Sequence, residues 1–215
     1  MFSKIYPKIH AEGYKFLVIA GIITIIFYIF SDFLGLLGFV LTIWVYYFFR
    51  DPERVIINDD NFLVSPADGE VIKVEEVDGP KELNLENKRF KKISIFMNVF
   101  DCHVNRSPCG GKIEEILYKP GKFFNASLDK ASEDNERNYF KIKDNQNNDI
   151  VLVQIAGLVA RRIVCVVNKD QELNQGDRVG MIRFGSRADV YYENYEPLVK
   201  VGQIAVSGET LLAKK

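Results

Sequence analysis

Three short segments of this sequence carry polar side chains that could perform chemistry. His103 lies in DCHVNR, Asp68 lies in SPADG, and the pair Gly185-Ser186 lies in FGSR. Histidine is the side chain best suited to proton transfer near neutral pH, and His103 is the only histidine after residue 15. A serine hydroxyl is a poor nucleophile unless a base takes its proton. Acid–base chemistry at a serine is therefore a candidate activity.

Each of these residues also has an ordinary structural explanation. A single histidine is often structural, Asp-Gly after proline is common turn chemistry, and Gly-Ser commonly joins two strands. The residues around Ser186 do not form the GxSxG nucleophile elbow, which argues against a serine hydrolase. With one central histidine and no clustered carboxylates, we expect no metal site.

Composition narrows the class of protein. The formal charge is −1, from 28 Lys and Arg against 29 Asp and Glu, so no basic field indicates a nucleic-acid partner. The cysteines Cys102, Cys109 and Cys165 lack CxxC spacing, which suits neither a disulfide framework nor a zinc site. We therefore expect the cysteines to lie in a reducing environment, on the cytosolic side.

Two apolar runs near the amino terminus predict a membrane anchor. They cover 14–30 and 33–49 and are separated by Ser31-Asp32. Each is at the short end of what crosses a hydrocarbon core of roughly 30 Å, and inside lipid both should be helical. The runs thus predict a helical hairpin with both ends on one side of the membrane.

Flanking charge gives the expected orientation. Lysines precede the first run, Arg50 and Arg54 follow the second, and the connecting Ser-Asp carries no positive charge. The positive-inside rule then puts both ends and the rest of the chain in the cytoplasm, at the cell membrane. The alternatives are a cleaved signal peptide, a hairpin buried in a protein core, or a shallow re-entrant hairpin.

After Arg50 the chain reads as a series of short strands separated by turn residues. This pattern predicts a mainly β fold, a compact sandwich or barrel-like domain. The stretch 129–148 is charged and rich in asparagine, and we expect a mobile or partly helical insertion there. The expected strands are 70–77, 92–99, 112–118, 150–155, 162–167, 178–184 and 199–206.

A repeated glycine-turn pattern suggests a more specific architecture. PADGEV, LNQGDRVG and KVGQIAVSGETL resemble the half-motifs of lipoyl and biotinyl domains. Those domains present a modifiable lysine at a hairpin tip, and no lysine occupies such a tip here. Lipoyl-like elements are therefore an expectation about the fold and not about carrier function.

Across nearly its whole length the sequence resembles the short, prokaryotic form of phosphatidylserine decarboxylase. The longer members of that family carry Leu-Gly-Ser-Thr at the bond that is cut, where this chain has the short-form variant Phe-Gly-Ser-Arg. The longer forms also have a second histidine where this chain has Arg106. The matching stretches are FFRDPER at 48–54, SPADG at 65–69, DCHVNR at 101–106 with Pro108, QIAGLVARRI at 154–163 and FGSR at 184–187.

The resemblance implies a self-cleaving enzyme that makes its own cofactor. Ser186 would attack the carbonyl of Gly185, with His103, oriented by Asp68, as the base, and a covalent pyruvoyl group would remain at position 186. The family reaction converts phosphatidylserine to phosphatidylethanolamine and CO₂. A carbonyl cofactor supplies the electron sink that no ordinary side chain provides. Candidate anchors for the carboxylate or phosphate of the substrate are Arg106, Arg187, Arg161 and Arg162.

The resemblance also implies an organisation of the chain. We expect an anchoring hairpin at 1–54 and a catalytic domain at 55–215, cut into chains 1–185 and 186–215 that stay together and could assemble further. The expected partners are the membrane and its phospholipid. The alternatives are a membrane-tethered lipoyl-like adaptor without catalysis, or the same chemistry on an ether-linked serine lipid.

Overall fold

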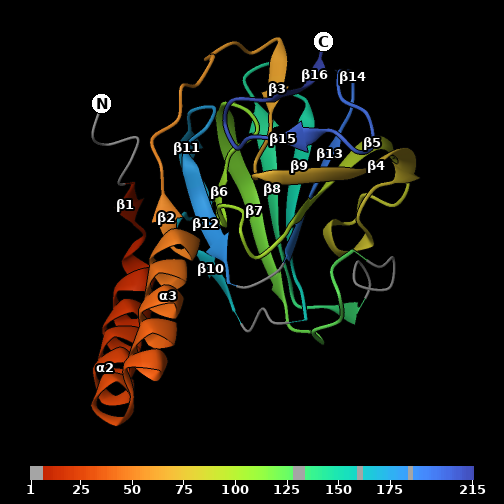
Figure 1. Cartoon of the computed structure of the whole chain (residues 1–215). Helices are drawn as coiled ribbons and strands as arrows, with labels where there is room; N and C mark the ends of the chain where they lie inside the picture. Colours follow the sequence, from red (N-terminus) through yellow and green to blue (C-terminus); the bar gives the residue numbers. More distant parts are fainter. Residues whose placement is uncertain (1–6, 128–133, 159–161, 184–185) are drawn as a thin grey trace. The chain divides into compact units, whose positions relative to one another are not determined.

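The computed structural model describes residues 7–127, 134–158, 162–183 and 186–215. The chain divides into two compact units, Met1–Glu53 and Arg54–Lys215. The first is helical and the second is built almost entirely from strands (Figure 1). The prediction of a mainly β protein with amino-terminal helices is confirmed.

The first unit is a hairpin of two helices, α2 (Tyr14–Phe30) and α3 (Asp32–Phe48). Ser31 separates them, because its extended backbone ends α2 while its hydroxyl accepts a hydrogen bond from the Phe33 amide at 3.3 Å and caps α3. The polar break in the sequence is thus a one-residue turn. At the open end lie η1 (Ala11–Gly13) and the paired strands β1 (Lys8–Ile9) and β2 (Arg50–Asp51).

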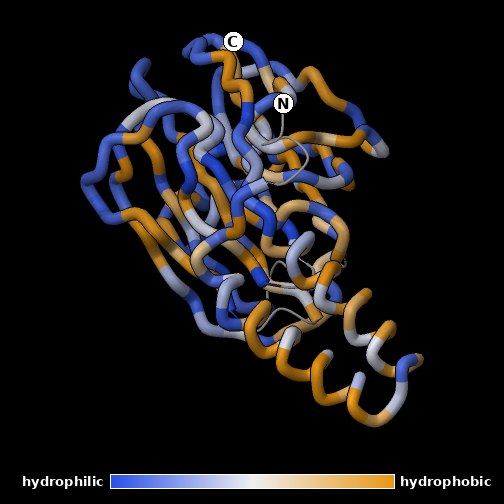
Figure 2. Tube along the Cα trace, turned by 60° about the vertical axis from the view of Figure 1, so that its left-hand side comes forward, coloured by the Kyte–Doolittle hydropathy of each residue, from blue (hydrophilic) through white to orange (hydrophobic). Residues whose placement is uncertain are grey.

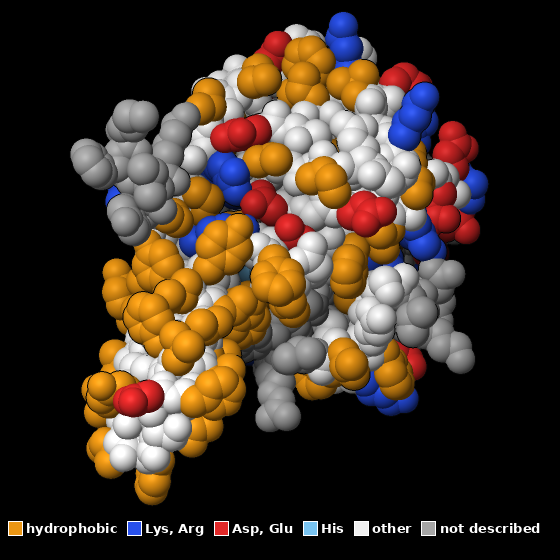
Figure 3. Space-filling view, viewed as in Figure 1, with side chains coloured by type: hydrophobic (Ala, Val, Ile, Leu, Met, Phe, Trp, Pro, Cys, Tyr) orange, Lys and Arg blue, Asp and Glu red, His pale blue; other side chains and the backbone are white. Residues whose placement is uncertain are grey.

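The hairpin has its apolar side chains on the outside. The buried residues of its two helices are the small residues Ala20, Gly35 and Gly38 together with Phe48 at the end of α3, whereas most of the large apolar side chains are exposed. Figure 2 shows the hydrophobic character of both helices, and Figure 3 shows apolar side chains on their surface. The helical stretch Ala11–Phe30 is long and apolar enough to cross a membrane, and α3 is a shorter apolar helix.

The second unit is organised around one strongly curled antiparallel sheet of eight strands (Figure 1). Its order is β11-β7-β8-β9-β13-β5-β4-β15, so that the late strand β13 lies in the middle, between β9 and β5. The strands are β4 (Gly69–Asp78), β5 (Arg89–Met97), β7 (Gly111–Lys119), β8 (Arg137–Asp144), β9 (Asp149–Ala156), β11 (Glu172–Leu173), β13 (Ser186–Tyr192) and β15 (Ile204–Ala205).

Among the described residues of this unit lie also two three-stranded sheets and the short helix η2. Their strands run in the orders β10-β12-β6 and β14-β16-β3. The first of these sheets brings the segment around residue 105 next to the segment that leads toward residue 183. The elements are β3 (Phe62–Val64), η2 (Lys81–Leu83), β6 (Val104–Arg106), β10 (Ile163–Cys165), β12 (Arg178–Ile182), β14 (Glu196–Pro197) and β16 (Leu211–Lys214).

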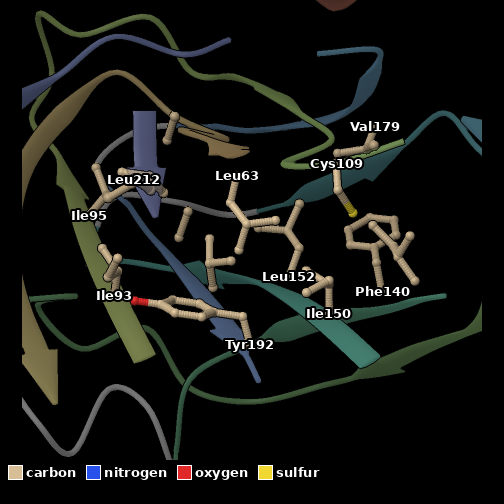
Figure 4. Packing of buried hydrophobic residues seen from close by; sticks show 14 of the residues in the cluster. Leu63, Ile93, Ile95, Cys109, Phe140, Ile150, Leu152, Val179, Tyr192 and Leu212 are labelled. Atoms are coloured by element: carbon tan, nitrogen blue, oxygen red, sulfur yellow. The ribbon is translucent and has the colours of Figure 1, made fainter. Parts of the chain in front are cut away.

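Both faces of the large sheet are covered by apolar side chains. Alternate residues of β13, such as Ala188 and Val190, point into the main core, which Figure 4 shows around Leu152 and Phe140. The opposite face carries a smaller cluster that includes Tyr139 and neighbours of β9. The sheet therefore has an inner face toward the main core and an outer face toward the smaller cluster.

The expectation of an insertion at 129–148 is wrong for its second half. Arg137–Asp144 forms β8, a central strand paired with both β7 and β9. Phe140 and Ile142 alternate with Lys141 and Lys143, which is the period of a strand with one buried face. The lysines find acidic partners, with Lys143 2.9 Å from Asp149, so the charged composition does not prevent burial of the strand.

Candidate active site

Ser186 is the first residue of β13 and is fully buried. It pairs with Met97, the last residue of β5, on one side and with Ala156, the last residue of β9, on the other. Its hydroxyl lies 3.7 Å from the Met97 sulfur. Its partner in the expected cleavage, Gly185, lies outside the described residues. The serine singled out by the sequence thus sits at the end of a central strand, in apolar surroundings.

Asp68 lies just beyond the same end of the sheet. Its neighbour Gly69 opens β4 with φ +148° and leaves no room for a side chain, since a Cβ would lie 2.1 Å from the Phe96 carbonyl oxygen. Glu70 and Arg187 both pair with Phe96, so β4 is two strands from β13, or about 10 Å.

The Asp68 carboxylate has two partners in the structure. Arg54 Nη2 lies 2.6 Å from one carboxylate oxygen and 2.9 Å from the other, and the Ser207 amide donates to Asp68 at 2.8 Å. The Arg54 and Asp68 side chains are 15% and 14% exposed, so this ion pair is largely shielded from water. Arg54, which the sequence indicated only as a positive charge after the second apolar run, is thus the ion-pair partner of Asp68.

His103 immediately precedes β6 and is fully buried. Its Nδ1 lies 2.9 Å from the Asp101 carbonyl oxygen. Because a carbonyl can only accept, we assign the ring proton to Nδ1, which leaves the lone pair of the neutral imidazole on Nε2. The His103 carbonyl in turn accepts from the Ile182 amide, at the end of β12 and close in sequence to the FGSR segment.

The expected contact between Asp68 and His103 is replaced by other partners. Arg54 and Ser207 hold the carboxylate, and a backbone carbonyl holds the imidazole. The two residues still belong to one end of the unit, because the Pro66 carbonyl accepts from the backbone amide of Arg106 in β6. Their segments are brought together, while the orientation of His103 comes from its own loop.

A buried row of amide side chains leads to the Met97 sulfur beside Ser186, and little in the sequence indicates it. Asn138 donates to Gln154 at 3.4 Å, and Gln154 donates to Asn105 at 2.8 Å. Asn105 Nδ2 then lies 3.6 Å from the sulfur of Met97, the same atom that Ser186 contacts. The one available signal was polar residues at core-facing positions of strands, which are costly to bury.

The candidate arginines occupy different environments. Arg187 is buried on the outer face of the sheet, opposite to Ser186, and its guanidinium makes two 2.6 Å contacts with Asp189. Arg106 donates to the Gly176 carbonyl at 2.9 Å. Arg162 is exposed, and Arg161 lies outside the described residues.

The outer face carries polar and charged side chains beside its smaller apolar cluster. A cavity of about 390 Å³ there is lined by residues that include Lys92, Arg137, Asp189 and Tyr191. Burial raises the pKa of the Tyr191 hydroxyl, and the Asp189 charge raises it further, so this tyrosine stays neutral. Among the described residues, no group of three His, Cys, Asp or Glu side chains could hold a metal ion.

Comparison with known proteins gives matches that cover most or all of the chain. The family model for phosphatidylserine decarboxylase matches residues 41–213. A phosphatidylserine decarboxylase proenzyme of Pelagibacter ubique (strain HTCC1062) is 74% identical over 215 residues, covering 100% of both chains. Proenzymes of Cereibacter sphaeroides (50% over 214 residues, 99% of this chain and 92% of the relative) and Ruegeria pomeroyi (53% over 205 residues, 95% and 94%) are also similar.

These matches span the helical unit and the β unit together. The protein is therefore a β-sheet protein with an amino-terminal helical hairpin that is similar to proenzymes over its full length. The chain belongs to the phosphatidylserine decarboxylase family.

Proposed function

We propose that this chain cleaves itself between Gly185 and Ser186 and then decarboxylates phosphatidylserine to phosphatidylethanolamine. Besides family membership, one observation carries the proposal. The serine of FGSR is fully buried at the first residue of a central strand, and the segments that bear His103 and Asp68 meet at the same end of the unit.

Self-cleavage needs a base, and His103 can serve as one. With its proton on Nδ1, the Nε2 lone pair takes the proton from Ser186 Oγ as that oxygen attacks the Gly185 carbonyl carbon. The peptide C–N bond breaks, and the nitrogen of residue 186 takes up a proton, which leaves an ester. Loss of the Ser186 Cα proton expels the residue 185 carboxylate, together with the former Oγ. One water then converts the dehydroalanine into a pyruvoyl group and ammonia.

The surroundings of Ser186 suit an uncharged group of similar size. The side chain is enclosed by Met97 and lies beside Ala156, neither of which carries a charge. When present, the pyruvoyl group supplies the carbonyl that takes up the electron pair left as CO₂ departs. His103, then in its protonated form, returns a proton to the substrate carbon.

Asp68 acts beside this histidine through its charge. Arg54 and the Ser207 amide fix its carboxylate in place, so its position does not depend on the substrate. Of the candidate anchors, the exposed Arg162 and its neighbour Arg161 suit the lipid phosphate or carboxylate best. Arg106 and Arg187 already donate to Gly176 and Asp189.

The helical unit brings the enzyme to a substrate that remains in the bilayer. We propose that 1–54 anchors the chain in the cell membrane and that the β unit, with its proposed lipoyl-like elements, works on the cytoplasmic side. The lysines before α2 and the arginines after α3 support this orientation. The cut chains 1–185 and 186–215 stay together as the working enzyme.

Intact-mass spectrometry of the purified protein tests the proposal. We expect two chains, 1–185 and 186–215, the second without a free amino group and reactive toward carbonyl reagents. Ser186→Ala should give one uncut, inactive chain. Ser94→Ala is the matched control, because Ser94 is an equally buried serine on β5 that no proposed step uses.

Two results would contradict the proposal. An intact wild-type chain of 215 residues would favour a tethered adaptor without catalysis. Activity that survives Ser186→Ala would exclude the pyruvoyl mechanism. Assays on diacyl and ether-linked serine lipids separate the two substrate classes.

A further inference from the structure

The buried amide chain that ends at Met97 runs in one direction. Asn138 and Gln154 each donate to the next residue, so the Asn105 side-chain oxygen is occupied by Gln154 at 2.8 Å. The Asn105 NH₂ group is thereby turned toward the Met97 sulfur at 3.6 Å and the Pro66 carbonyl at 3.4 Å. All three amide side chains are at most 2% exposed.

This row of three amide side chains is energetically costly in an otherwise apolar core. Buried amides destabilise a fold unless they are hydrogen-bonded, and a thioether is a weak acceptor. Gln154 and Asn138 face the same core as Ile150, Leu152 and Phe140, where aliphatic side chains would fill the space without polar atoms. Fold stability therefore does not explain why these three amide side chains are present.

The reason lies at the sulfur, where two hydrogen-bond donors meet. Asn105 Nδ2 approaches the Met97 sulfur at 3.6 Å and Ser186 Oγ approaches it at 3.7 Å. Methionine has three rotatable bonds, and a partner on its sulfur restricts them. A hydroxyl that donates to sulfur keeps both oxygen lone pairs for attack, and its weak hydrogen bond is easily given up to a base.

We propose that Asn105 and Met97 are positioning residues for maturation: Asn105 fixes the Met97 thioether, which orients the Ser186 hydroxyl before cleavage. This inference rests on the proposed self-cleavage at 185–186. It makes a specific prediction, because the Ser186 oxygen that Met97 orients leaves with the residue 185 carboxylate during cleavage. Met97 should therefore matter for maturation and not, through this contact, for turnover afterwards.

The experiment compares Met97→Leu with Ile95→Val in the full-length chain. Met97→Leu keeps the volume and removes the sulfur, whereas Ile95→Val loosens the same core from the same strand, two residues away. Cleavage is followed by intact mass after synthesis, and the decarboxylation rate is measured per matured chain. Thermal unfolding confirms that both variants fold.

We expect Met97→Leu to mature roughly tenfold more slowly, the effect of losing one weak hydrogen bond at the reacting group. Ile95→Val should mature at the wild-type rate, and Met97→Leu should slow maturation much more than it changes turnover of the matured chain. Asn105→Ala should slow maturation as well, and adding it to Met97→Leu should give much less than the product of the two effects.

Three outcomes would overturn the inference. They are wild-type maturation of Met97→Leu, equal slowing in Ile95→Val, and a loss of turnover that matches the loss of maturation. A wild-type chain that is never cut would instead contradict the proposed function itself, so the two failures are distinguishable.

Discussion

The helical hairpin and the β unit both place polar side chains in internal hydrogen bonds, but they do so for different reasons. In the hairpin, the Thr24 and Thr42 hydroxyls lie 2.9 Å apart between the helices, and each also bonds the carbonyl four residues earlier in its own helix. In the β unit, the buried amides pass from strand to strand and end at the Met97 sulfur, which the Ser186 hydroxyl also contacts. The polar contacts join two helices in the first unit, and in the second they lead to the neighbour of the proposed nucleophile.

The exposed surfaces differ in the same way. The hairpin puts its large apolar residues outward and its small ones inward, which suits a lipid environment, where helices associate through close contact and interhelical hydrogen bonds. The β unit buries its apolar residues on both faces of the sheet. Mutations should therefore have large effects in the β unit and small ones in the hairpin.

The largest effect is expected at the Arg187–Asp189 pair on the outer face. Asp189→Leu removes the carboxylate that faces a guanidinium with 0% exposure and should lower the free energy of unfolding. Breaking such a buried pair costs about 3–5 kcal/mol. Chemical denaturation of the β unit measures the loss, and the double variant Arg187→Met/Asp189→Leu should recover most of it. A loss below about 1 kcal/mol in the single variant would contradict this account.

A smaller effect is expected where the β unit begins. Arg54→Ala removes two contacts to the Asp68 carboxylate, at 2.6 and 2.9 Å. Hydrogen bonds to charged groups contribute about 1.5–3 kcal/mol, and the pair is largely shielded. Denaturation and the rate of self-cleavage should both report the loss. Arg54→Lys should restore part of the cleavage rate, and full cleavage in Arg54→Ala would show that Asp68 needs no such support.

A third effect grows only as the pH falls. Burial raises the pKa of Asp149, but hydrogen bonds from Lys88 and Lys143 and the nearby charge of Lys141 outweigh it, so the pKa is lowered overall. A lowered pKa in the folded state gives stability that is present above the unfolded value and is lost as the pH falls through the folded value. The stability of the β unit should therefore decline below about pH 4. Asp149→Asn should flatten this decline in denaturation experiments, and an unchanged slope would assign it to other carboxylates.

The smallest effect is expected in the hairpin. Thr42→Val keeps the shape and removes one interhelical hydrogen bond, and such bonds average about 0.6 kcal/mol in membrane proteins. Amide hydrogen exchange in α2 should increase slightly in detergent micelles, while unfolding of the β unit stays unchanged. A destabilised β unit would contradict the separation of the two units.

The helical hairpin and the β unit also differ in how much of their structure could be predicted from the sequence. The helices were predictable to within a residue, because a continuous apolar run with a polar break has few alternatives. The strand β8 was missed because its alternation lies among lysines and asparagines. That Lys141 is paired is revealed only by a partner distant in sequence, Glu114. The strand β13 was missed because Gly-Ser was interpreted as a turn.

For the site, Ser186, His103 and Asp68 were selected from residue type together with the family resemblance, and their roles stay predictions. Residue types could not identify Arg54 as the partner of Asp68 or Met97 as the neighbour of Ser186. Those contacts depend on strand order, which places β13 beside β5 although about ninety residues separate their ends. Register across a sheet is a property of the whole fold and leaves little local signal.

The central place of β13 has a consequence for the life of the mature protein. This strand pairs along its whole length with β5 and β9. A cut just before Ser186 therefore leaves residues 186–215 held in the sheet by strand pairing on both sides of β13. While folded, the two pieces behave as one body. Once unfolded, they are separate molecules, and their reunion depends on concentration, as in any two-component assembly. The chain would thus fold as one polypeptide only before cleavage. Thermal unfolding of the cut protein would be far harder to reverse than thermal unfolding of the uncut one.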